Sequence, residues 1–214
     1  MKINLKKIYT FALLAGGLSG IILFQGCTGK SDLSAKIQKE YLNATNGYLD
    51  NMEAQLNRLG DFSLEDKTIL KDKTGLAAAK TVVEGTVKAD IELFDAMKSR
   101  IDSLKAQYAD TSPASAEVQS TYDSLAKDFQ DLQDLDTERG NAMLTYLDFV
   151  IAHSGEITID GNNVRLESED LSKKYNELEK TASNKQLKFD AVQGDILDRH
   201  DRDFKAFADA LAKQ

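Results

Sequence analysis

The fold is decided by residues 113–153, which read PASAEVQSTYDSLAKDFQDLQDLDTERGNAMLTYLDFVIAH. Apolar side chains recur in this stretch at intervals of three and four residues, the period of a helix with one buried face. Ser112-Pro113 before it is a helix start signal, and Ser154-Gly155 after it is a stop signal. The spacing therefore predicts one long helix from Pro113 to His153. Its expected inner positions are Val118, Tyr122, Leu125, Phe129, Leu132, Met143, Tyr146 and Val150.

Two charged residues interrupt the apolar stripe of this helix. The register places Asp136 and Arg139 on the inner face. An aspartate and an arginine three residues apart can pair, but burying them is unfavourable unless both are hydrogen-bonded. We therefore expect either an internal ion pair or a bend near Gly140.

The same apolar period continues on both sides of this stretch. We expect Ser31 to cap a first helix that ends at Gly60, and Ser63 to begin a second with a break or kink near Gly75. Ser168 is expected to cap the last helix. The inner positions are Leu33, Ile37, Tyr41, Ala44, Tyr48, Met52, Leu56 and Leu59 in the first helix, Val87, Ile91, Phe94, Met97, Ile101, Leu104 and Tyr108 in the second, and Leu171, Tyr175, Leu178, Ala182, Phe189, Val192, Ile196, Phe204, Phe207 and Leu211 in the last.

Residues 156–167 follow a different period. Apolar residues alternate on either side of Asp160-Gly161-Asn162-Asn163, which is typical of a β-hairpin with its turn at Gly161-Asn162. Pairing residue 159 with 164 and 157 with 166 puts Ile157, Ile159, Val164 and Leu166 on one face. Two strands alone are marginally stable, so this face should dock on the helices or on a partner. The sequence predicts an all-α fold, an elongated antiparallel bundle of three to four long helices with one small hairpin before the last helix.

The N-terminal segment carries its own pattern. Lys2, Lys6 and Lys7 precede residues 8–24, which hold no charge, and small Gly26 stands directly before Cys27, the single cysteine of the chain. A transmembrane helix and a plain secretory signal are the alternatives, but the apolar run has 17 residues and three glycines, short of the roughly 20 that span a bilayer. A lone thiol would also lack a partner in an oxidising compartment.

The segment resembles a bacterial lipoprotein signal peptide. The resemblance implies a diacylglyceryl group on the Cys27 sulfur, cleavage before Cys27, and acylation of the new amine, as with palmitate. Residues 1–26 would then be the signal peptide, residues 27–30 a lipidated tether, and residues 31–214 the helical bundle domain. Thr28, rather than aspartate, follows the cysteine, which by the same resemblance favours the outer membrane, facing the periplasm or the cell surface.

The charge of the chain excludes some partners. Residues 27–214 hold 24 basic and 35 acidic residues, a net charge of −11. Nucleic acids and anionic lipid head groups require positive charge from a protein. We therefore expect no nucleic-acid partner and a membrane contact through the lipid on Cys27 alone.

A second resemblance covers the layout of the chain. Asp148-Phe149-Val150-Ile151, Gly155, Ile157-Thr158-Ile159, Gly161, Leu166 and Tyr175-Asn176 are similar to a family of uncharacterised bacterial helical lipoproteins, catalogued as domain of unknown function 3053. The resemblance implies a helical lipoprotein and supplies no activity, cofactor or catalytic residue.

The residues offer few chemical sites. The richest cluster is Asp195, Asp198, Arg199, His200, Asp201, Arg202 and Asp203. It lacks the spacing of metal ligands on a helix, so we interpret it as a solvated face with ion pairs, with His200 on the inner seam four residues before Phe204. His153 is expected at a helix C-terminus, where the helix dipole favours a cation. We expect no catalytic residues, no metal and no cofactor.

Six tyrosines fall on or near the expected inner faces: Tyr41, Tyr48, Tyr108, Tyr122, Tyr146 and Tyr175. Tyrosines of this kind usually pack their rings in the core, although a ligand cleft between helices is the alternative. The leading hypothesis is a non-enzymatic, lipid-anchored bundle for an envelope protein partner, with the hairpin as the most distinctive surface and the partner-binding residues unknown. The alternatives are a small-ligand or envelope-stress binding protein with an inter-helical pocket, and an enzyme acting on cell-wall or lipid material.

Overall fold

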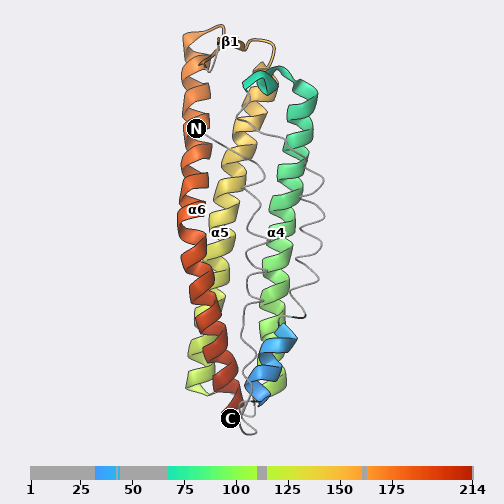
Figure 1. Ribbon diagram of the computed structural model, residues 1–214, viewed down its shortest axis with the longest axis vertical. Helices are drawn as coiled ribbons and strands as arrows, with labels where there is room; N and C mark the ends of the chain where they lie inside the picture. The colour runs from blue at the N-terminus through green and yellow to red at the C-terminus, as the bar shows by residue number, and fades with distance from the viewer. Residues whose placement is uncertain (1–31, 42, 44–66, 110–114, 161–162, 214) are drawn as a thin grey trace. The chain divides into compact units, whose positions relative to one another are not determined.

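The computed structural model describes residues 32–41, 43, 67–109, 115–160 and 163–213. Within these residues the fold is all-α with one small hairpin before the last helix (Figure 1), as the sequence predicts. Residues 32–41 and 43 are helical, while the expected end of this first helix at Gly60 lies outside the described residues. The other elements are η2 (Lys67–Lys71), α4 (Lys73–Tyr108), α5 (Ala116–His153), β1 (Thr158–Asp160), β2 (Asn163–Arg165) and α6 (Glu169–Ala212).

The chain divides into two compact units, and each of the three long helices contributes to both. Unit 1 contains, among the described residues, those within 67–89 and 135–191, and unit 2 contains those within 32–43, 90–134 and 192–213. Neighbouring helices run antiparallel in each unit, because partner numbers on one helix fall as those on the other rise. The partners in unit 1 are Lys80 with Asp148, Val87 with Gly140, Glu138 with Lys185, and Tyr146 with Tyr175.

The helices of unit 2 have the same antiparallel arrangement, and the N-terminal helical residues pack beside them. Ser34 donates a hydrogen bond to Asp209 of α6 at 2.7 Å, so helical residues 32–41 pack beside the C-terminal part of α6. The other partners are Asp102 with Tyr122, Lys105 with Gln119, Asp128 with Arg199, and Glu117 with Lys213.

The break expected near Gly75 is present, three residues before it. It falls at Asp72, between η2 and α4, and Gly75 lies inside the helix. The Asp72 carboxylate accepts a hydrogen bond from the backbone N–H of Gly75 at 2.9 Å. Aspartate satisfies the free N–H groups of a first helical turn, and this cap, rather than the flexibility of glycine, sets the boundary.

The start of α5 differs from the prediction. The helix begins at Ala116, and the Ser115 hydroxyl accepts the backbone N–H of Val118 at 3.3 Å. Ser115 is therefore the cap that we assigned to Ser112, which lies outside the described residues together with Pro113. The cap of α6 is as predicted, since the Ser168 hydroxyl accepts the N–H of Leu171 at 3.1 Å.

The hairpin closes one part of the unit 1 core. Thr158 pairs with Arg165, and Ile159 with Val164, in the predicted register, although the strands are shorter than residues 156–167. Its apolar face docks on the helices, as expected. Ile157 and Leu166 are buried in a cluster with Leu76, Val83, Met143, Tyr146, Leu147, Val150 and Tyr175.

Among the described residues, the predicted inner positions are buried or half-buried with one exception. Val192 was expected to point inward, but 37% of it is exposed. The predicted inner positions Ala44, Tyr48, Met52, Leu56 and Leu59 lie outside the described residues. The inner charged pair is confirmed: Asp136 and Arg139 are both buried and form an ion pair within α5. The arginine guanidinium also lies 4.0 Å from the centre of the Phe189 ring of α6, an arrangement that favours a cation.

Gly140 is required by the close approach of α4. A Cβ built at this position would lie 2.2 Å from Cγ2 of Val87, and valine has little χ1 freedom in a helix. We expect Gly140→Ala to lower the free energy of unfolding by about 1–3 kcal/mol through overpacking. Urea unfolding followed by circular dichroism measures the change.

Gly85 in α4 provides the matched control. A Cβ there meets nothing within 4 Å, so Gly85→Ala should raise stability by about 0.5–1 kcal/mol through helix propensity. Adding Val87→Ala to Gly140→Ala should recover most of the loss. If Gly140→Ala is as stable as Gly85→Ala, the close contact is not what fixes glycine at this position.

Candidate functional site

The lipidation site expected at Cys27 lies outside the described residues. Within the part of the chain that the structure describes, no helix is both long enough and apolar enough to cross a bilayer. The remaining sequence candidates fall on α5, the hairpin and α6, and each can be followed in the structure.

The segment of α6 between Asp195 and Asp203 is only partly the solvated face that we expected. Asp195, Asp198 and Arg202 are exposed. Arg199 instead binds across to α5, where it pairs with Asp128 and, at 2.8 Å, with Asp131. These pairs hold α5 and α6 together in unit 2.

His200 is buried on the inner seam, as predicted, and it is the centre of an aromatic cluster. Its Nε2 lies 3.0 Å from the hydroxyl of Tyr41, which comes from the N-terminal helical residues. The Phe129 ring centre is 4.7 Å from the imidazole, and Phe204 stacks on Tyr41 with 4.1 Å between ring centres. The cluster therefore joins α5, α6 and the N-terminal helical residues.

The electrostatics of this cluster favour neutral side chains. Burial lowers the pKa of His200 from 6.5 to about 4. Burial, together with the nearby Asp198, raises the pKa of Asp201 from 3.8 to about 6. The pKa of Tyr41 is raised well above 10.0 by burial and then by Asp201.

A neutral His200 has one acceptor and one donor nitrogen. Nε2 meets the Tyr41 hydroxyl, while Nδ1 has no hydrogen-bond partner among the described residues. A general base needs an accessible nitrogen, a nucleophile and an orienting group. The observed contacts of His200 are those of a side chain that fills and aligns a core.

Metal ligation gains no support from the described residues, which contain no group of three or more His, Cys, Asp or Glu side chains placed to hold a metal ion. His153 is the last residue of α5, where we expected it. Its Nδ1 lies 2.8 Å from Glu156, and its ring lies 4.6 Å from that of Phe149. These contacts fix the turn between α5 and the hairpin.

A second polar cluster joins η2, α5 and α6 in unit 1. Lys67 pairs with Glu179, and the Tyr175 hydroxyl donates to the same carboxylate at 3.3 Å. The Tyr146 hydroxyl lies 3.2 Å from that of Tyr175. Burial would lower the pKa of Lys67, but the hydrogen bond to Glu179 and the charges beside it raise it. The result is a charged lysine bound to a carboxylate, which attaches η2 to α6.

The tyrosines divide between core and edge positions. Tyr41, Tyr146 and Tyr175 are buried, as core packing predicts. Tyr108 and Tyr122 are half-buried, and their hydroxyls donate to Glu40 at 2.8 Å and to Asp102 at 2.6 Å. Tyr48 lies outside the described residues.

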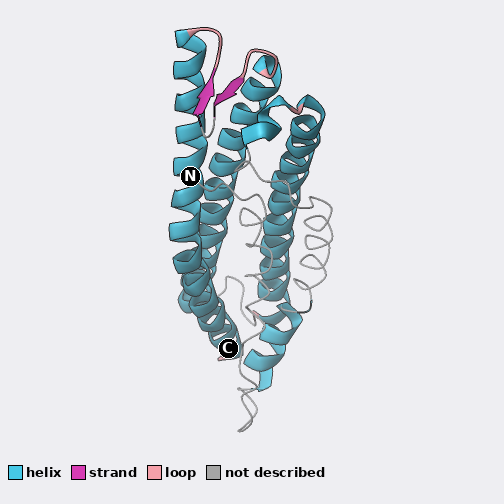
Figure 2. Ribbon diagram, turned by 45° about the horizontal axis from the view of Figure 1, so that its top comes forward, coloured by secondary structure: helices cyan, strands magenta, loops and turns pink. Residues whose placement is uncertain are grey.

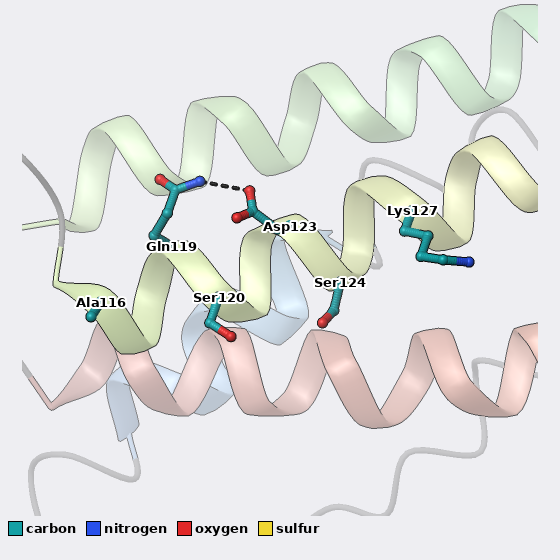
Figure 3. A pocket seen from close by; sticks show the side chains of 6 residues that line it. All are labelled: Ala116, Gln119, Ser120, Asp123, Ser124 and Lys127. Atoms are coloured by element: carbon teal, nitrogen blue, oxygen red, sulfur yellow. Dashed lines mark hydrogen bonds between the residues drawn. The ribbon is translucent and has the colours of Figure 1, made fainter.

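A hollow of about 570 Å³ follows the N-terminal part of α5 (Figure 3). All of its lining side chains come from this one helix, and two of them, Gln119 and Asp123, are hydrogen-bonded to each other at 2.6 Å. It is therefore an open surface groove, unlike the inter-helical pocket of the small-ligand hypothesis. The lining residues are Ala116, Gln119, Ser120, Asp123, Ser124 and Lys127.

The hairpin presents a polar outer face. The two strands are the magenta arrows in Figure 2. Thr158 and Arg165, which face each other across them, are both exposed, whereas Ile159 and Val164 are half-buried. The short strands carry backbone groups at their outer edges, and such edges can accept another strand.

Sequence reasoning missed two of the residues that build these clusters. Lys67 was assigned no role, and only its ion pair with Glu179, which is distant in sequence, reveals that it attaches η2 to α6. Asp128 was not among the predicted inner residues, although it is 1% exposed; its position one residue before the inner Phe129 was the available signal.

No family model, curated protein or solved structure matches the chain, so both resemblances stay predictions.

Proposed function

We propose that the chain is a lipid-anchored lipoprotein of a bacterial envelope, and that its helical bundle is a non-catalytic module for structural support or protein binding. The observation that carries the proposal is the N-terminal pattern. Lysines precede an uncharged run, and the single cysteine of the chain follows directly after Gly26. This is the order of regions in a secretory signal, and it gives the lone thiol of Cys27 a purpose.

The interior contacts support the second half of the proposal. In each unit a titratable side chain contacts other side chains of the same unit: the half-buried Lys67 with Glu179, and the buried His200 with Tyr41. Asp136 and Arg139 pair inside α5. Contacts of this kind fix the relative positions of helices within a unit, as a binding or structural module requires.

The lipid is tested by changing its attachment atom. We expect the intact mass of the membrane-extracted chain to include a diacylglyceryl group, and Cys27→Ser to lose it because a hydroxyl does not replace the thiolate in this modification. Thr28→Ser, which leaves the cysteine in place, is the matched control and should keep the lipid. An unmodified Cys27 in the extracted wild-type chain would remove the anchor from the proposal.

Crosslinking in native membranes, followed by mass spectrometry, tests the binding half. The lipidated chain is expected to yield the same envelope protein in repeated experiments, and the Cys27→Ser chain to lose it. If no protein is recovered reproducibly with the lipidated chain, the module has a structural role without a stable protein partner.

A further inference from the structure

Unit 2 has a defined end at which the N-terminal helical residues begin. Ser34 donates to Asp209 near the C-terminus of α6, and Lys213, which follows the last residue of α6, pairs with Glu117 of α5 at 2.7 Å. The start of the N-terminal helical residues is therefore level with the start of α5 and the end of α6. We call this the Glu117 end of unit 2.

The contacts of Tyr41 show in which direction the N-terminal helical residues run from this end. Tyr41, seven residues after Ser34, contacts His200, which lies against Phe129 of α5. Both His200 and Phe129 are further from the helix termini than Asp209 and Glu117 are. Helical residues 32–41 thus run from the Glu117 end into unit 2.

The anchor is attached close to the same end. Asp32, the first described helical residue, comes only five positions after Cys27. A chain of five residues spans at most about 18 Å, whatever path it takes. A lipid on Cys27 therefore holds the Glu117 end within roughly that distance of the bilayer surface.

The sides of the helices give the bilayer little to bind. The chain after residue 26 has a net charge of −11, which opposes contact with anionic head groups. Among the described residues, the large apolar side chains that are exposed are Leu187 and Val192, and of these only Val192 lies in unit 2. A helix that lies along a membrane needs a continuous apolar face, and unit 2 exposes none among these residues.

We propose that unit 2 meets the lipid surface end-on, with its Glu117 end toward the bilayer and the sides of its helices free for other contacts. This inference rests on the proposed lipidation of Cys27. It goes further in assigning which part of the bundle faces the membrane.

Single introduced cysteines test the orientation, because lipidation leaves the chain without any other thiol. Ala116→Cys and Gln130→Cys are exposed positions on α5, separated by about 21 Å of helix. Gln107→Cys and Asp95→Cys are the corresponding pair on α4, separated by about 18 Å. Each full-length lipidated variant is labelled with a fluorophore and placed in phosphatidylcholine vesicles that contain a lipid with a quencher on its head group.

End-on contact predicts that the labels at residues 116 and 107 are quenched at least about two-fold more than those at 130 and 95, on both helices, given the separations along the axis. Equal quenching within either pair, or the reverse order, overturns the proposal, since a side-on bundle quenches one helix along its length. Intact mass separates the two levels. A chain that carries label on Cys27 and no lipid overturns the proposed function, whereas a lipidated chain with equal quenching overturns the orientation alone.

Discussion

Arg139→Met in α5 is expected to lower the free energy of unfolding by about 3–5 kcal/mol. Arg139 is 2% exposed, and its guanidinium pairs with the carboxylate of Asp136, which is 3% exposed. Removing the arginine leaves the aspartate charge in the core without its cation, and it also removes the contact with the Phe189 ring. Urea unfolding at neutral pH measures the loss.

A double replacement separates the buried charge from the packing. Asp136→Leu combined with Arg139→Met removes both charges and keeps apolar volume, so its stability should be within about 1 kcal/mol of the wild type, or above it. Lys185→Met is the matched surface control, because Lys185 of α6 pairs with Glu138 of α5 at 2.7 Å while 37% of its side chain is exposed. Its expected change is below about 1 kcal/mol.

The comparison has a clear contrary outcome. If the double variant is destabilised as strongly as Arg139→Met alone, the arginine matters through its shape and its contact with Phe189, and not through the carboxylate. A loss at Lys185→Met equal to that at Arg139→Met would show that burial does not distinguish the two ion pairs.

The apolar period allowed most of the fold to be predicted, because apolar side chains at intervals of three and four residues line one face of a helix, and that face is buried when it packs against other helices. It placed even the unfavourable pair Asp136 and Arg139 inside, since the register is set by the apolar residues on either side. The hairpin register followed in the same way from alternation about its turn, with Ile159 opposite Val164.

Helix boundaries were less predictable, because several residues near each end can supply a cap. Both Ser112 and Ser115 can accept backbone N–H groups, and only the observed bond from Val118 decides between them. Asp72 similarly competes with the two flexible positions Gly75 and Gly85, and its bond to Gly75 sets the start of α4.

Contacts between distant side chains could not be read from the sequence. Arg199 sits among acidic neighbours on α6, any of which is a local candidate, yet it pairs with Asp128 and Asp131 of α5. The choice depends on the rotation of α5 against α6, which the periods of the two helices do not specify. The role of His200 was inferred from its spacing to Phe204, whereas its partner Tyr41 required the fold.

Asp201→Asn is expected to make the protein more sensitive to acid, with stability falling by about 3 kcal/mol between pH 7 and pH 4. The cause is His200, whose pKa is about 4 in the folded chain and 6.5 ordinarily. Between pH 6.5 and pH 4 the imidazole of His200 is protonated in the unfolded chain and neutral in the folded chain. Stability is thus fully present above pH 6.5 and is lost as the pH falls toward 4.

Asp201 acts in the opposite direction in the wild type. Its pKa is about 6 in the folded chain against 3.8 ordinarily, so the folded state binds a proton first as the pH falls. Folding is therefore favoured increasingly between pH 6 and pH 4, and this gain offsets part of the loss from His200. The offset is incomplete because the Asp201 carboxyl is only half-buried and its interactions are screened by solvent.

Four chains isolate the two contributions: the wild type, Asp201→Asn, His200→Gln and the double variant, which titrates at neither position. Free energies of unfolding are measured at intervals from pH 7 to pH 4, and each single variant is compared with the double variant so that common carboxylates cancel. The His200→Gln chain should gain stability relative to the double variant as the pH falls, and the Asp201→Asn chain should lose it. The ion pair of Asp128 with Arg199 is present in all four chains. The Tyr41 hydroxyl loses its histidine partner in the two chains that carry His200→Gln, but its pKa lies well above 10.0, so it takes no part in the titration between pH 7 and pH 4. Parallel profiles for Asp201→Asn and the double variant would mean that His200 takes up its proton in the folded chain as easily as in the unfolded one, and the aromatic cluster around it would then not be closed to water.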